Sequence, residues 1–384
     1  MNKKWRDGLL AAAALAVVGG LFFWSRQTTP EQVAAVLFDM NVPARYVFIG
    51  DTNASRLASV DIESGALVGE LPLQAVPRLL AVNKHHGLLA YADESARQIF
   101  VRNLATHAEQ VFALPHEAAG MTFDSDTPRL FVHGATAFSQ LDVSSASLQT
   151  FDGFSVLRSL HVEPLTRDIV LLDGGAREIK HISLYENEIS TFPLPQGWQD
   201  FTASALSPGG DYLLFGVYDA VQAQHLGVVW RSDDQSWQTY PMAAPLLQPV
   251  TDNNATALFF LDKSGQGLRI DAADFANVRP FATAEKPSRL ALGWLDQHLL
   301  VAGENALYLL DSATLQPLAQ TPFPGAAHDI FITADSKTAL LTAQGSRDLL
   351  LYDMRDGGAV RAVALGEAAQ PGAVRMGAGY TLCH

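Results

Sequence analysis

The chain of 384 residues contains a single cysteine, Cys383. One thiol cannot form an intrachain disulfide, and it cannot supply the thiolate cluster of a structural zinc or iron–sulfur site. Basic residues are also scarce, since 26 Lys and Arg stand against 40 Asp and Glu, giving a formal net charge of −14. Such an acidic surface repels phosphate backbones, so we predict that the protein does not bind nucleic acid.

Motifs of the common enzyme classes are missing as well. The sequence has no Gly-x-Ser-x-Gly nucleophile elbow, no His-Glu-x-x-His zinc motif, no phosphate-binding P-loop and no Cys-x-x-Cys-His haem attachment motif. We therefore assign no catalytic residue, no metal ligand and no resident cofactor, and we favour a function without catalysis.

What the sequence does contain is a repeated apolar run that ends in Asp or Gly. The clearest copies end at Asp51, Asp93, Asp173 and Asp262, and weaker copies end at Gly134, Gly216, Gly303 and Gln344. Subtracting successive positions gives gaps of 42, 41, 39, 43, 46, 41 and 41 residues. A period of this length over strand-forming sequence is typical of one four-stranded blade of a β-propeller.

The repeat predicts an all-β fold, a β-propeller of four-stranded blades that covers residues 35–384. The eight copies favour eight blades, and seven is the alternative if the copy at Gly134 or Gly216 is miscounted. Each unit begins with a short apolar stretch, which we expect to form the innermost strand beside the central channel. Two segments could supply the strand that closes the ring, residues 372–376 or residues 38–40.

A second recurrent feature is an aspartate at a turn in the later half of several units. It occurs at Asp61, Asp142, Asp271, Asp311 and Asp353. An Asp side chain can accept hydrogen bonds from backbone N–H groups two residues on, and this fixes a tight turn. We interpret these aspartates as structural and assign them no chemistry.

The amino-terminal residues are typical of a membrane anchor. Three basic residues among the first six precede an uncharged run of 18 residues, 8–25, which is close to the minimum length for a spanning helix. Basic residues favour the cytoplasmic side. We therefore predict a cytoplasmic segment 1–7, a single transmembrane helix 8–25 in the inner membrane, a linker 26–34 and a periplasmic domain. A cleaved signal peptide is the alternative.

One turn supports a family resemblance in addition to the repeat. Residues 206–211, Leu-Ser-Pro-Gly-Gly-Asp, come close to a Ser-Pro-Asp-Gly turn. Over residues 35–384 the repeats resemble those of exported bacterial propellers of the YVTN and quinoprotein amine-dehydrogenase heavy-chain type. The Trp docking motifs and calcium ligands of alcohol-oxidising quinoproteins are missing, so the resemblance transfers no catalytic residue to this chain.

Charged residues recur just before the expected innermost strands. Arg78, Arg158 and Arg289 each precede one such strand, and His328 and Asp329 precede another. Equivalent positions of different blades should converge on one mouth of the channel, so these five residues are our candidate ligand-binding site. Gathered arginines would form a positive funnel for a carboxylate, a phosphate or a haem propionate. Alternatively, each arginine pairs with an acid of the next blade and staples the ring.

The remaining histidines and the cysteine have ordinary interpretations. His161 lies in an apolar stretch, as a hydrogen-bonded core histidine would. His116 could reach the same mouth as His328, and Cys383 with His384 could bind a soft metal, but no motif supports either site. We leave them unassigned.

Together these features favour a binding function. We predict a membrane-anchored periplasmic propeller that acts as a non-catalytic binding or assembly platform, for instance in the maturation or docking of a periplasmic redox protein. The expected partners are a periplasmic protein and a small anionic ligand at the channel mouth. The alternative is the propeller subunit of a periplasmic oxidoreductase, which holds a cofactor or supports a catalytic partner. The fold does not choose between them, because propellers host many unrelated functions.

Overall fold

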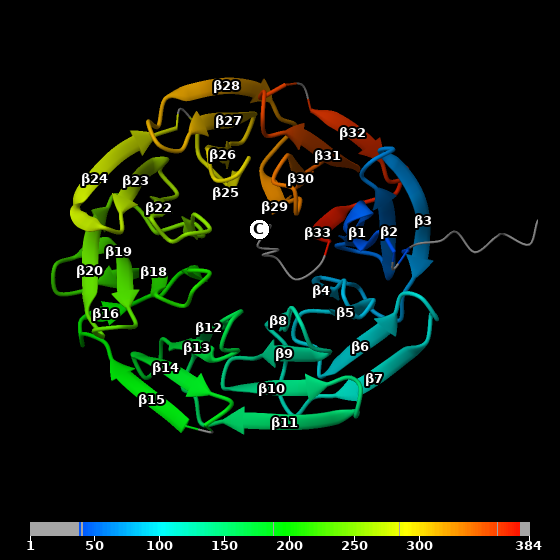
Figure 1. Cartoon of the computed structure of the whole chain (residues 1–384), viewed down its shortest axis with the longest axis horizontal. Helices are drawn as coiled ribbons and strands as arrows, with labels where there is room; N and C mark the ends of the chain where they lie inside the picture. The colour runs from blue at the N-terminus through cyan, green and yellow to red at the C-terminus, as the bar shows by residue number, and fades with distance from the viewer. Residues whose placement is uncertain (1–37, 40, 187, 284, 359, 377–384) are drawn as a thin grey trace, which may run out of the picture. The chain divides into compact units, whose positions relative to one another are not determined.

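A computed structural model describes residues 38–39, 41–186, 188–283, 285–358 and 360–376 of the chain. Within these residues, antiparallel strands form eight sheets that surround a central channel as the blades of a propeller (Figure 1). Seven of these sheets have four strands and one has five. The prediction of an eight-bladed all-β propeller is confirmed, and the copies ending at Gly134 and Gly216 belong to complete blades.

The chain enters the first blade through a short 3-10 helix, η1 (Pro43–Arg45). From the channel outward, blade 1 contains β33 (Pro371–Arg375), β1 (Tyr46–Asp51), β2 (Arg56–Asp61) and β3 (Ala66–Pro72). Blade 2 contains β4 (Leu79–Asn83), β5 (Leu88–Ala92), β6 (Gln98–Asn103) and β7 (Glu109–Ala113). Blade 3 contains β8 (Gly120–Phe123), β9 (Arg129–His133), β10 (Ala137–Asp142) and β11 (Ser147–Asp152). Blade 4 contains β12 (Leu157–Val162), β13 (Ile169–Asp173), β14 (Glu178–Ser183) and β15 (Glu188–Pro193).

The other four blades follow the same order. Blade 5 contains β16 (Trp198–Gln199) and β17 (Ser204–Leu206), which both pair with β18 (Tyr212–Asp219), then β19 (Gln224–Arg231) and β20 (Trp237–Met242). Blade 6 contains β21 (Val250–Thr251), β22 (Ala257–Leu261), β23 (Gln266–Asp271) and β24 (Asp274–Ala282). Blade 7 contains β25 (Arg289–Gly293), β26 (His298–Ala302), β27 (Ala306–Asp311) and β28 (Pro317–Pro322). Blade 8 contains β29 (Ala327–Ile332), β30 (Thr338–Ala343), β31 (Asp348–Asp353) and β32 (Arg361–Ala364).

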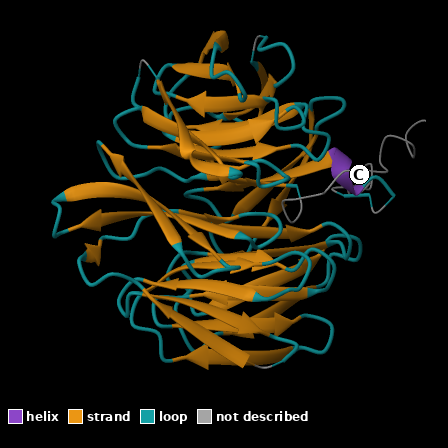
Figure 2. Ribbon diagram, turned by 60° about the vertical axis from the view of Figure 1, so that its left-hand side comes forward, coloured by secondary structure: helices purple, strands orange, loops and turns teal. Residues whose placement is uncertain are grey.

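The second strand of each blade explains the repeated apolar run. Every residue of β5, β13 and β22 is buried, because neighbouring blades pack against both faces of these strands (Figure 2). A strand covered on both faces must be apolar along its whole length. The outermost strands, such as β11 and β15, are largely exposed and carry mixed sequences.

The last described strand closes the ring. β33 pairs with β1, with Val374 opposite Ile49 and Arg375 opposite Phe48. Blade 8 holds the same strand from the other side, since the Thr342 hydroxyl donates to the Gly372 carbonyl at 2.6 Å. Residues 372–376 are therefore the segment that completes blade 1.

The alternative closure by residues 38–40 is wrong. Phe38 and Asp39 lie outside every described strand, and Met40 is outside the described residues. The Phe38 ring instead packs against Tyr46 and Phe48, each with a centroid separation of 6.1 Å. The channel-side edge of β1 is already paired with β33, so no edge is left for a second inner strand.

The recurrent aspartates fix turns as predicted. The Asp142 carboxylate accepts the N–H of Ser144 at 3.0 Å, and the Asp353 carboxylate accepts the N–H of Arg355 at 2.8 Å. Both turns join the third and fourth strands of a blade. These carboxylates are occupied by local backbone bonds, which agrees with a structural role.

The predicted anchor and linker, residues 8–25 and 26–34, lie outside the described residues, as do Cys383 and His384. The described propeller begins at Phe38. In this described part, no helix is both long and apolar enough to cross a membrane.

Candidate functional site

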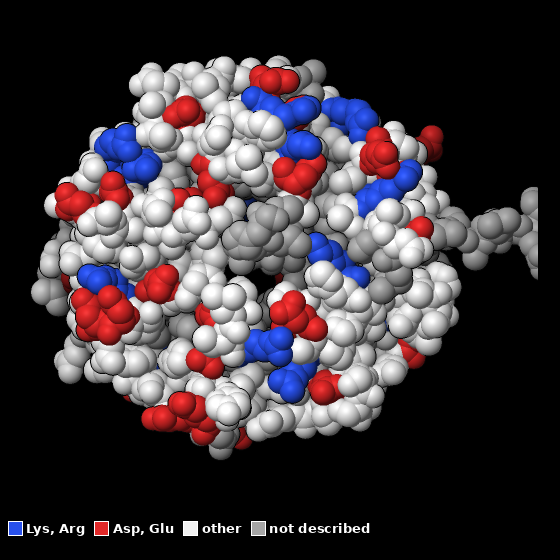
Figure 3. All heavy atoms as spheres, in the orientation of Figure 1, with Lys and Arg blue, Asp and Glu red and all other residues white. Residues whose placement is uncertain are grey.

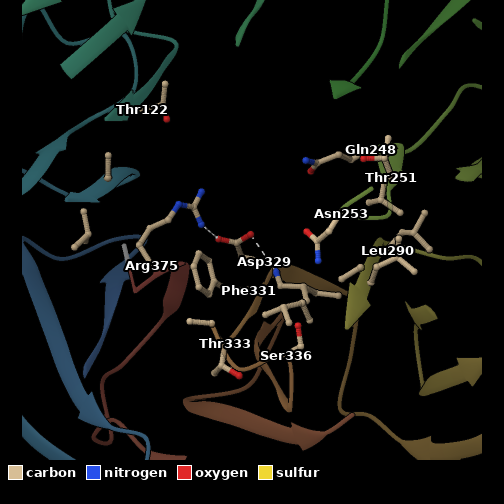
Figure 4. Close-up of a pocket in the computed structure, with 18 of the residues that line it drawn as sticks. Thr122, Gln248, Thr251, Asn253, Leu290, Asp329, Phe331, Thr333, Ser336 and Arg375 are labelled. Atoms are coloured by element: carbon tan, nitrogen blue, oxygen red, sulfur yellow. Dashed lines mark hydrogen bonds and ion pairs between the residues drawn. The ribbon is translucent and has the colours of Figure 1, made fainter. Parts of the chain in front are cut away.

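The innermost strands surround a cavity of about 410 Å³ in the central channel. Its wall is mixed. Apolar side chains come from Leu80 of blade 2, Met121 of blade 3, and Leu290 and Phe331 of blades 7 and 8. Polar and charged side chains make up the rest, and several of them are labelled in Figure 4: Thr122, Gln248, Thr251, Asn253, Asp329, Thr333, Ser336 and Arg375. The volume lies within the usual range of small-molecule pockets.

An ion pair between Arg375 and Asp329 reaches into the cavity (Figure 4). Arg375 ends β33 of blade 1 and Asp329 lies in β29 of blade 8, so the pair joins the two blades at the ring closure. Nη1 of Arg375 donates to Oδ2 of Asp329 at 2.5 Å and to the Val374 carbonyl at 2.6 Å. The same Oδ2 accepts the N–H of Val374 at 3.0 Å. Asp329 therefore fixes both the guanidinium of Arg375 and the backbone of β33, the strand that carries it.

This arrangement leaves one edge of the Arg375 guanidinium free. Nε and Nη2 have no hydrogen-bond partner among the described residues, and the side chain keeps 35% of its surface exposed. Nε and Nη2 form a planar pair of donors that matches the two oxygens of a carboxylate or phosphate. The residue can hold one anion in the cavity while Nη1 stays bonded to Asp329.

One of the five residues proposed from the sequence, Asp329, lies on the wall of this cavity. His328 precedes it in β29 and is exposed, and it is not among the described lining residues. Successive side chains of a strand point to opposite faces, so neighbours in sequence need not share a site.

The three predicted arginines lie at or just before inner strands but outside the described lining of the cavity. Arg78 pairs with Asp93 at 2.5 Å, and the two residues belong to the same blade, so it is not a staple between blades. Arg289 donates to the Ser288 carbonyl at 2.9 Å. Arg158 is exposed and has no ion-pair partner among the described residues. Anion binding by these arginines stays a prediction.

The charges on the molecular surface can be compared with the positive funnel expected at the channel mouth. On the face in Figure 3, Lys and Arg of the described residues are interspersed with Asp and Glu around a hollowed centre. Neighbouring charges of opposite sign largely cancel each other's field at a distance, and salt limits the reach of what remains to about 8 Å at physiological ionic strength. Anion selectivity at this face would therefore have to come from individual side chains inside the channel.

A smaller recess of about 210 Å³ shares Thr122 and Phe123 with the main cavity. His161 of β12 lines it, and its Nε2 is hydrogen-bonded to the Ser204 hydroxyl at 2.9 Å. Burial, with a smaller contribution from His133, lowers the pKa of His161 to about 4. His161 is therefore a neutral imidazole at neutral pH, and it is hydrogen-bonded as predicted.

The suggestion that His116 reaches a channel mouth is wrong. Its side chain is buried in blade 3, with Nε2 bonded to the Ser139 hydroxyl at 2.9 Å and Nδ1 to the Glu117 carbonyl at 2.9 Å. Ser139 lies in the third strand, β10, and is completely buried. A nucleophile must be accessible to its substrate. This Ser–His contact is therefore structural.

Sequence reasoning missed Arg375. The rule applied to the sequence looked for charge before an inner strand, whereas Arg375 lies within one. Its place in the register is that of Ala81 in blade 2 and Ala291 in blade 7. A charged residue at a position where blades 2 and 7 carry alanine was the available signal.

No family model and no curated protein sequence matches the chain. Among solved structures, it is similar to the dihydro-heme d1 dehydrogenase NirN in complex with DHE, with a TM-score of 0.70 and 15% identity over 87% of this chain and 75% of that chain. It is also similar to the Kuenenia stuttgartiensis hydrazine synthase, with a TM-score of 0.53 and 11% identity over 82% and 94% of the two chains. It is similar as well to the WD40 repeats of RRP9, with a TM-score of 0.52 and 13% identity over 86% of this chain and 90% of that chain. At these identities the likeness shows the propeller fold, and the resemblance to the exported YVTN type stays a prediction.

Proposed function

We propose that this propeller is a binding platform whose central channel takes a small molecule that bears a carboxylate. The free Nε–Nη2 edge of Arg375, inside the channel cavity, carries the proposal. A charge-assisted bidentate pair is stronger in such a site than in bulk water, because the effective dielectric constant is lower. The structural similarity to NirN, a protein solved in complex with DHE, supports small-ligand binding by a propeller of this architecture.

The sequence contributes the remainder of the proposal. We expect the platform to stand in the periplasm on its amino-terminal anchor and to dock a periplasmic protein. The anion site proposed here lies inside the channel and not at its mouth, since Arg375 and the predicted Asp329 line the cavity, whereas the other four predicted residues lie outside its described lining.

Calorimetric titration with caproate, a straight-chain monocarboxylate, tests the ligand class. Arg375→Gln should weaken caproate binding by about tenfold or more, because hydrogen bonds to charged groups are lost. Arg375→Lys should recover part of the affinity, since it restores the charge without the two-donor edge. Melting temperatures of all variants confirm that the folded protein is being measured.

Arg97→Gln is the matched control, because it removes the same charge from an exposed position outside the described cavity lining. It should leave caproate affinity unchanged. Equal losses in Arg97→Gln and Arg375→Gln, or no binding of caproate by the unmodified protein, would rule out the Arg375 site.

A second candidate function is the cofactor-holding subunit of an oxidoreductase, and His161 favours it. Its Nδ1 has no hydrogen-bond partner among the described residues, and a neutral imidazole beside a cavity is a form that ligates haem or copper. His161 would supply one nitrogen ligand, and the bound group would supply electron transfer. An absorption band in the protein purified from its host, absent in His161→Ala, distinguishes this function from the first.

A further inference from the structure

Asp296 is another charged residue on the wall of the channel cavity. It lies half-buried in the turn between β25 and β26. Its Oδ2 accepts the backbone N–H of Asn253 at 2.9 Å, and its Oδ1 accepts the Asn253 side-chain amide at 3.2 Å. No Lys, Arg or His of the described residues forms an ion pair with it. The carboxylate is thus fixed in orientation and has no cationic partner there.

The backbone that presents Asp296 has an uncommon conformation. Trp294, Leu295 and Asp296 have φ angles of 49°, 54° and 64°, which is the left-handed region for three successive non-glycine residues. Neighbouring groups hold this turn, since the N–H of Trp294 donates to the Ser336 carbonyl at 2.6 Å and the Ser312 hydroxyl donates to the Asp296 carbonyl at 2.5 Å. Strained backbone of this kind persists where its surroundings enforce it. Here it brings a carboxylate to the cavity wall.

The register separates Asp296 from Arg375 along the channel. Arg375 is level with Ala291 of β25, which lies two residues before the end of that strand at Gly293. A strand rises by about 3.3 Å per residue, so the backbone of Asp296, beyond Gly293, lies about 7 Å or more farther along the channel axis. A ligand that contacts both residues must be elongated.

The cavity wall carries different charges at Arg375 and at Asp296. Asp329 is paired with Arg375, whose free edge suits a carboxylate. At Asp296, burial and then the neighbouring Asp252 carboxylate raise the pKa, and the N–H of Asn253 opposes the shift in part. An ammonium group beside Asp296 would relieve this unfavourable negative charge, whereas a second carboxylate would add to it.

We infer that the channel cavity recognises an elongated amino acid, with its carboxylate on Arg375 and its terminal ammonium on Asp296. The Arg375 half of this inference rests on the proposed function. The Asp296 half adds the chemical class of the other end of the ligand, an ammonium group. Plain fatty acids and dicarboxylates lack this group and are therefore not expected to be the best ligands.

Three probes of equal chain length test the second contact. ε-Aminocaproate, caproate and adipate end in ammonium, methyl and carboxylate groups opposite their shared carboxylate. The unmodified protein should bind ε-aminocaproate about tenfold more tightly than caproate, and adipate more weakly than caproate. In Asp296→Asn the advantage of ε-aminocaproate should disappear, and caproate affinity should stay within about twofold.

Asp296→Asn is a conservative test, because Asn tolerates the left-handed conformation and keeps an oxygen acceptor. Asp200→Asn is the matched control, since it removes an exposed carboxylate at another left-handed position, with a φ angle of 52°, outside the described lining, and it should keep the preference. If ε-aminocaproate binds no better than caproate, or if both variants lose the preference equally, the inference fails and the carboxylate site stands. If caproate does not bind at all, the proposed function fails, and the inference fails as well because it rests on that function.

Discussion

Single aspartates tie the segments of a blade together. Asp173 ends the apolar run of blade 4, is completely buried, and accepts four backbone N–H groups at distances between 2.9 and 3.2 Å. The donors are Ser155, Val156, Gly175 and Ala176. Two of them lead into the inner strand and two form the following turn, so one carboxylate joins three segments. Asp262 makes comparable bonds in blade 6, which explains why the repeat favours Asp at this position.

The Asp173 bonds predict a dependence of stability on pH. Burial alone would raise the pKa of Asp173, but the four N–H groups together outweigh it, and the pKa lies below its ordinary value. Since the folded state lowers this pKa, the stabilisation is complete above the ordinary carboxyl pKa of about 3.9. It is lost as the pH falls from there through the lower folded-state value.

Asp173→Asn should therefore lower the free energy of unfolding near neutral pH by about 2 kcal/mol, because buried N–H groups lose an ionic acceptor. It should also flatten the acid branch of stability against pH, measured by denaturant unfolding. Asp152→Asn, at an exposed position of β11, should change neither quantity. An unaltered acid branch in Asp173→Asn would contradict this role.

Among the elements, β33 has the largest consequence for the ring. Val374 at its centre is completely buried, and the strand covers an edge of β1 that would otherwise offer unpaired backbone groups. Exposed edges of this kind promote aggregation. The strand also brings Arg375 into the cavity, so closure of the ring and assembly of the candidate site depend on the same five residues.

Two truncations test the closing strand. A chain ending at Met376 keeps every described strand and should melt like the full-length protein. A chain ending at Gln370 lacks β33 and should aggregate or lose much of its thermal stability, because Val374 and the edge of β1 lose their cover. Calorimetry and light scattering measure both effects. Identical melting of the two truncated chains would show that the ring closes without β33.

For the whole molecule, the two ends of the described propeller meet in blade 1. The Arg375–Asp329 pair lies at this junction and also in the cavity. A ligand that binds the folded ring alone stabilises it by mass action, so ligand occupancy should also favour closure.

The location of the whole molecule stays a prediction, based on the basic residues before the uncharged run 8–25. A reporter that is active only in the periplasm, fused after residue 384, should be active. The protein should also remain with membranes after a high-salt wash. Recovery of a soluble form that begins near residue 26 would show cleavage, and an inactive reporter would argue against export.

By itself the sequence determined the fold class and the turn aspartates, and it favoured eight blades over seven. These features are local and recur from unit to unit, since the second strands are covered on both faces and a tight turn needs a nearby acceptor. The sequence left the closing strand open between two segments, because either has the composition of an inner strand.

The tertiary structure alone decided which charged groups share the cavity. Arg375 and Asp329 are 46 residues apart and meet because ring closure places the inner strands of blades 1 and 8 side by side. Asp296 and Asn253 are 43 residues apart and meet through the register of blades 6 and 7. A repeat pattern is the same in every blade, so it cannot say which side chains face each other across the channel. Which side chains meet depends on how far along the channel each inner strand lies and on which of its faces points into the channel. The packing of neighbouring blades sets both.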